Sequence, residues 1–192
     1  MPMLVLRRLA ISRSGPLYWT RAIPTPILLL VWLACGRSVS QRAIAAFEVA
    51  IRFNPSFAAA HVLLAQMYLY AGRREEAIRR AEKGIRLSPS DPRLFIWLPA
   101  LAGAHYQMRH YWEAVEAGRR SWSLNRNWPH GLRYVVAGLG QMGRIEDARA
   151  ALAELKLMDA NQEASARVLR RNGSDPADVD HLLEGLRKAG FE

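Results

Sequence analysis

The chain has 192 residues, of which 51% are hydrophobic and 23% are charged, so it can build a core and is neither disordered nor of low complexity. This length suits one compact domain or one short repeat array and excludes a multidomain enzyme. Basic residues outnumber acidic ones by 27 to 17, but residues 1–47 hold six arginines and no acidic residue, so the excess is mainly N-terminal.

The N-terminal segment, residues 1–25, shows no sustained hydrophobic period, and we expect a poorly ordered basic leader there. The nine apolar residues Ile27–Cys35 follow it, too few to cross a bilayer, which needs roughly 20. They have the length of the apolar region of a signal peptide, and Ala34 before Cys35 resembles a lipoprotein cleavage site. Export or lipid anchoring through residues 1–35 therefore stays open beside the reading we favour, an apolar helix of a cytoplasmic protein. The only cysteine, Cys35, allows no intramolecular disulfide.

A repeat of 34 residues follows. Four alanines, Ala43, Ala77, Ala114 and Ala148, begin matched apolar segments, with steps of 34, 37 and 34 residues. Pro55 and Pro89 are also 34 residues apart, after matched segments. We expect three clear units and one degenerate unit over residues 26–160.

Each unit is predicted to be a pair of helices. In the best copy the first helix runs from Ala58 to Ala71, and Gly72 permits the left-handed conformation that ends it. The second runs from about Arg74 to Leu87, with its apolar residues at helical spacing. The residues expected to pack the repeats together are Ala43, Pro55, Leu64, Tyr68, Ala77, Pro89, Ala114 and Ala148.

Residues 161–192 are predicted to form capping helices. A short helix is expected around residues 162–170. A second begins after Asp175-Pro176, an N-cap followed by proline at the first helical position, and ends at Gly190. Its apolar stripe, Val179, Leu182, Leu183 and Leu186, is expected to cover the exposed face of the last unit.

These residues resemble the tetratricopeptide repeat (TPR) family. The family's Trp, Leu-Gly, Tyr, Ala, Phe, Ala and Pro positions are held here by His61, Leu64, Ala65, Tyr68, Ala77, Ala81, Gly84 and Pro89. The resemblance implies an all-α fold, a right-handed α-solenoid of helix-turn-helix repeats with a C-terminal capping helix. Residues 88–107, 119–152 and 182–192 further resemble the C-terminal TPR region of bacterial class III adenylate and guanylate cyclases and related regulators, without the catalytic domain.

No catalytic or cofactor-binding pattern is present, and we expect neither an enzyme nor a bound cofactor. The chain has no Gly-x-Ser-x-Gly, phosphate-binding loop or dinucleotide fingerprint. No metal site is expected, because His105 and His110 are five residues apart, which on a helix directs them to different faces. A break near Arg109 is expected to separate them further. Nucleic acid is not favoured as a partner, since the tryptophans lie in or beside predicted packing helices.

The TPR resemblance implies a groove lined by the first helix of each unit. Carried over position by position, its candidate partner-binding residues are Gln66, Tyr70, Tyr106, Gln107, His130, Arg133 and Gln141. We expect another protein or peptide as partner, a second copy of the chain included, and a membrane only through the N-terminal segment. The alternatives are an exported or lipid-anchored TPR protein in envelope assembly and a detached regulatory piece of a nucleotide cyclase. The same groove residues could instead pack against neighbouring repeats.

Overall fold

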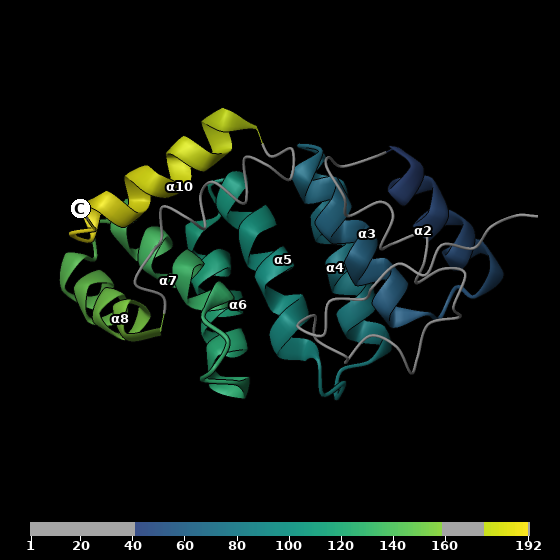
Figure 1. Ribbon diagram of the computed structural model, residues 1–192, viewed down its shortest axis with the longest axis horizontal. Helices are drawn as coiled ribbons and strands as arrows, with labels where there is room; N and C mark the ends of the chain where they lie inside the picture. The colour runs from purple at the N-terminus through teal and green to yellow at the C-terminus, as the bar shows by residue number, and fades with distance from the viewer. Residues whose placement is uncertain (1–40, 159–174, 192) are drawn as a thin grey trace, which may run out of the picture.

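The computed structural model describes residues 41–158 and 175–191, and all regular secondary structure within these ranges is helical (Figure 1). The predicted leader, the apolar segment 27–35 and the short helix at 162–170 lie outside the described residues. The helices are α2 (Gln41–Phe53), α3 (Ala58–Tyr70), α4 (Arg74–Leu87), α5 (Leu94–Gln107), α6 (Tyr111–Leu124), α7 (His130–Gln141), α8 (Ile145–Met158) and α10 (Pro176–Lys188).

Helices α3 to α8 form three successive helix pairs, and α2 precedes them. The predicted bounds of α4 are confirmed, and α3 ends one residue earlier than expected. Gly72 and Gly143 end α3 and α7 with a φ of 73°, the left-handed conformation that favours glycine. Arg109 adopts a φ of 62° at the corresponding turn after α5, where a side chain makes this conformation costly.

Small residues allow the helices to approach closely. Ala43, Ala77, Ala114 and Ala148 are each 2% exposed or less, as their spacing predicts. Helices α6 and α7 meet at Gly118 and Gly131, where a methyl group on Gly118 would lie 2.6 Å from the carbonyl oxygen of Gly131. Leu64 and Tyr68 are buried, whereas Pro55 and Pro89 lie in exposed turns after α2 and α4. The two prolines therefore follow helix ends and are not part of the buried core.

The C-terminal helix α10 begins as predicted. The side chain of Asp175 accepts a 2.9 Å hydrogen bond from the amide of Ala177, Pro176 occupies the first turn, and Gly190 follows the helix with a φ of 92°. The helix packs on the last unit, as expected of a capping helix. Helix α10 runs along one side of the array, from α3 and α4 towards α8, and packs mainly on α7 (Figure 1). Its stripe joins the core that contains Tyr106 and Ala137.

No helix within the described residues is long and apolar enough to cross a membrane.

Candidate functional site

The first helices of the three pairs, α3, α5 and α7, form one continuous surface near their C-terminal ends, which we call the inner face. Its residues are Leu69, Tyr70, Tyr106, Gln107, Tyr134, Ala137, Gly140 and Gln141. Four of the seven predicted groove residues, Tyr70, Tyr106, Gln107 and Gln141, belong to it. The inner face is not open to solvent along its length, because α10 lies on it. The cavity left between them measures about 20 Å³, roughly the space of one water molecule.

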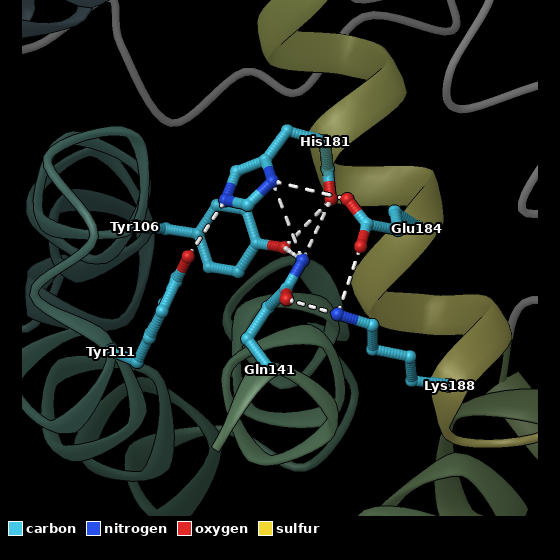
Figure 2. A network of polar contacts seen from close by, with 6 residues as sticks. All are labelled: Tyr106, Tyr111, Gln141, His181, Glu184 and Lys188. Atoms are coloured by element: carbon cyan, nitrogen blue, oxygen red, sulfur yellow. Dashed lines mark hydrogen bonds and ion pairs between the residues drawn. The ribbon is translucent and has the colours of Figure 1, made fainter. Parts of the chain in front are cut away.

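Tyr106 is the centre of the contact with α10. Its hydroxyl donates a 2.9 Å hydrogen bond to the main-chain carbonyl oxygen of His181 (Figure 2). The two rings are tilted, with centroids 5.0 Å apart, and the Tyr111 hydroxyl lies 3.0 Å from Nε2 of His181. Tyr106 is 1% exposed, so this bond is formed away from water.

Gln141 and Lys188 extend the same network on its far side. Nε2 of Gln141 lies 3.4 Å from both the Tyr106 hydroxyl and Nδ1 of His181 (Figure 2). Lys188 donates to Oε1 of Gln141 at 2.8 Å and forms an ion pair with Glu184, also at 2.8 Å. The hydrogen bond from Lys188 lowers the pKa of the Glu184 carboxyl. Helix α10 is thus joined to α5, α6 and α7 by polar contacts as well as by apolar packing.

Two tyrosines of the inner face, Tyr106 and Tyr134, are neutral groups. Burial raises the pKa of Tyr106 well above its usual range and raises the pKa of Tyr134 to about 12. Hydroxyls with such pKa values keep their protons at neutral pH. They can donate hydrogen bonds to a bound segment, but they do not supply a base or a nucleophile there.

Two glycines bring the backbones of α7 and α10 into contact. A methyl group added to Gly140 would overlap the carbonyl oxygen of Gly185. A methyl group on Gly185 would overlap the Tyr106 hydroxyl and lie 2.7 Å from the carbonyl oxygen of Ala137. Because neither position has room for a side chain, this crossing selects glycine on both helices.

An ion pair fixes the first turn of α10. Nη2 of Arg74 donates to both carboxylate oxygens of Asp178, at 2.8 and 2.9 Å. Asp178 is well shielded, with its side chain 11% exposed, and Arg74 is 33% exposed.

The sequence did not predict four residues of this site, which are Arg74, Tyr111, His181 and Gly185. Arg74 and Asp178 are 104 residues apart, and no local pattern in the sequence relates them.

The other three predicted groove residues lie elsewhere on the first helices. Gln66 is half-buried in the middle of α3, His130 is exposed at the first position of α7, and its ring lies 4.4 Å from that of Trp128. Arg133 is only 5% exposed. His130 and Arg133 begin α7 and Gln141 ends it, so the predicted set is divided between the two ends of this helix.

His105 and His110 are closer than the sequence predicted. The expectation that they face apart is wrong, because α5 ends at Gln107 and the left-handed Arg109 turns the chain back. Their ring centroids lie 5.8 Å apart. Burial lowers the pKa of His105. Among the residues that the structure describes, no group of three or more histidine, cysteine, aspartate or glutamate side chains is placed to hold a metal ion.

The arrangement of helix pairs is similar to that of two proteins of known structure. A crystal structure of MamA superposes with a TM-score of 0.57 at 18% identity, covering 77% of this chain and 84% of MamA. The crystal structure of YrrB, described as a TPR protein with an unusual peptide-binding site, gives 0.58 at 19% identity, covering 85% of this chain and 80% of YrrB. The fold is therefore all-α and of the TPR type. No protein-family model matches the chain, and no curated protein matches it in sequence.

Proposed function

We propose that the chain is a non-catalytic TPR-type interaction module that binds a segment of another protein on its inner face. The observation that carries this proposal is the seating of α10, an amphipathic helix held there by packing and by hydrogen bonds from Tyr106 and Gln141. A surface that holds one helix in this way has the shape and the donors to hold a segment of another protein. YrrB, which has this type of fold, is described as having a peptide-binding site.

The inner face supports binding better than catalysis. The hydroxyls of Tyr106 and Tyr134 have pKa values raised by burial, and the lining beside the tyrosines is apolar or amide. Such a surface offers contact area and hydrogen bonds, which recognition needs, and no group poised for proton transfer at neutral pH.

We propose two more specific roles, regulation of a nucleotide cyclase and envelope assembly. Residues 88–107, 119–152 and 182–192 resemble the repeat region of bacterial nucleotide cyclases, which favours a regulatory role with a cyclase domain as partner. Co-purification with a cyclase domain from the source cell would test it. The second role, envelope assembly after export or lipidation, depends on residues 1–35. Mass spectrometry of the native protein tests that role, because it predicts a mature chain that begins at an acylated Cys35.

The proposed binding surface is tested by affinity capture with matched variants. Tyr106→Ala is unsuitable, since Tyr106 is 1% exposed and its loss would destabilise the core. We use Tyr70→Ala, because this side chain belongs to the inner face and is half-buried at the end of α3. The control is Trp112→Ala, a 55% exposed residue on the second helix α6.

The proposal predicts that proteins retained by the wild-type chain are retained about tenfold less by the α3 variant and equally by the control. Melting temperatures of all three chains should agree, so that lost capture cannot be ascribed to unfolding. Equal capture by the α3 variant and the wild type would contradict the assignment of the inner face.

A further inference from the structure

We infer that the segment recognised by the inner face is an amphipathic helix with an acidic residue in its first turn and glycine seven residues later, and that it binds by displacing α10. This inference rests on the proposed function and names the class of partner that the same site takes. The features of the partner helix are taken from α10, because the contacts of α10 show which side chains the inner face accepts.

The acidic residue is bound by Arg74. Nη2 of its guanidinium donates to both carboxylate oxygens of Asp178, and this charge-assisted contact holds the first turn of the helix beside α4. Asp178 is the single acidic residue of the first turn of α10. A helix without a carboxylate at this position would leave a partly shielded cation, 33% exposed, without its partner.

The glycine is required by the bond that Tyr106 makes. Its hydroxyl donates to the carbonyl of His181, which lies one helical turn before Gly185. In an α-helix the side chain of residue i+4 lies beside the carbonyl of residue i, so a side chain at 185 would cover this acceptor. The overlap found for a methyl group on Gly185 agrees with this geometry. Tyr106 can therefore donate to this main-chain carbonyl only when the residue four positions later is glycine.

Both features lie on one face of the helix. Asp178 and Gly185 are seven residues apart, close to two helical turns, and Val179, Leu182 and Leu186 lie beside them at helical spacing. These three leucine and valine side chains are 4% exposed or less in the core they share with Ala137. A partner helix with the same face would make the same contacts, and it cannot do so while α10 is in place.

The probe is a fluorescent peptide with the sequence of residues 175–191, measured by anisotropy against full-length chains. In the wild type, α10 competes within the same molecule, so binding of the peptide should be weak. In the Asp178→Arg chain, two like charges meet at Arg74, so α10 should bind the inner face less stably and compete less with the peptide. We expect this chain to bind the wild-type peptide about tenfold more tightly or better.

Three controls make the result specific. A peptide carrying Gly185→Leu should bind the Asp178→Arg chain about tenfold more weakly than the wild-type peptide. An Arg187→Ala chain, altered at an exposed position of α10, should bind like the wild type. The Asp178→Asn chain, which removes the charge and keeps the size, should repeat the direction of the Asp178→Arg result even if the latter chain is less stable.

Equal affinity of the peptide for the wild-type and both Asp178 chains, or equal affinity of the two peptides, would overturn the inference. Dimers of the Asp178→Arg chain in sedimentation would also overturn it, because the occupant would then be α10 of a second copy. Loss of cellular capture by the Tyr70→Ala chain is independent of the peptide. If that loss is seen while the peptide fails to bind, the proposed function stands and the helix pattern is wrong.

Discussion

The hydroxyl of Tyr106 donates a hydrogen bond to the main-chain carbonyl of His181, although 75 residues separate the two along the chain. This bond ties the last helix to the second helix pair rather than to its neighbour in sequence. It explains why α10 lies along the array. Removing it should loosen α10 more than any other element.

Tyr106→Phe should lower the free energy of unfolding by about 1 kcal/mol and should speed hydrogen exchange of the α10 amides. The phenyl ring keeps the packing, so the effect comes from the lost hydrogen bond. Tyr68→Phe is the matched control, since the Tyr68 hydroxyl donates to Glu48 at 2.8 Å, away from α10. It should cost a comparable amount of stability and leave exchange in α10 unchanged. The reverse pattern would contradict the role given to Tyr106.

Gly140→Ala and Gly185→Ala should each destabilise the chain by about 1–3 kcal/mol, because the added methyl group meets backbone on the opposite helix. A drop of roughly 2–4 °C in melting temperature for each kcal/mol is expected for a chain of this size. Alanine normally stabilises a helix relative to glycine, so the sign of the effect is diagnostic. A gain in stability from either substitution would mean that α7 and α10 do not cross at these residues.

The ion pair between Arg74 and Asp178 can be tested by exchanging its charges. Arg74→Asp and Asp178→Arg should each loosen α10, and the double variant should recover a coupling energy of about 1 kcal/mol. The measurement is a double-mutant cycle on thermal or denaturant unfolding. Additive effects of the two substitutions would show that the pair is not formed in solution.

Acidification should destabilise the protein through His61, which is fully buried. Burial lowers its pKa, an effect that the nearby Lys83 and Arg80 increase and the hydrogen bond to the Pro55 carbonyl opposes. In the unfolded chain the pKa of histidine is about 6.5, so the unfolded state takes up the proton first. The stability present above about pH 6.5 is therefore lost as the pH falls below it.

The melting temperature should accordingly be a few degrees lower at about pH 5.5 than at about pH 7.5. His61→Gln should have a smaller pH dependence, at some cost in overall stability. His130→Gln, at an exposed position, should keep the wild-type pH dependence. A His61→Gln chain with an undiminished pH dependence would contradict the assignment to this residue.

Local signals account for what the sequence predicted well. Gly72 and the apolar spacing of residues 74–87 define α4 from within one segment, and Asp175 with Pro176 defines the start of α10 in the same way. The repeat of small residues at Ala77 and Ala114 likewise predicts which helix surfaces approach closely. The TPR-type fold follows from these neighbouring interactions, because each helix pair contacts mainly the next.

The contact of α10 with the last unit was predicted, but its extension along the array to Arg74 could not be predicted from the same kind of signal. It depends on Arg74 with Asp178 and on Gly140 with Gly185, pairs that are distant in sequence and ordinary in composition. The turn at Arg109 is a second example. A break there was expected, but the left-handed conformation of a non-glycine residue was not, and it brings His105 and His110 together instead of separating them.

The most direct test of the seating of α10 on the inner face is a set of NMR contacts in the full-length wild-type chain. The ring centroid of His181 lies 5.0 Å from the ring centroid of Tyr106 and 5.9 Å from that of Tyr111. We predict nuclear Overhauser effects from the His181 ring protons to the ring protons of both tyrosines. Absence of both, with contacts from α10 to the exposed side of α8 instead, would place α10 over the end of the array and contradict the account.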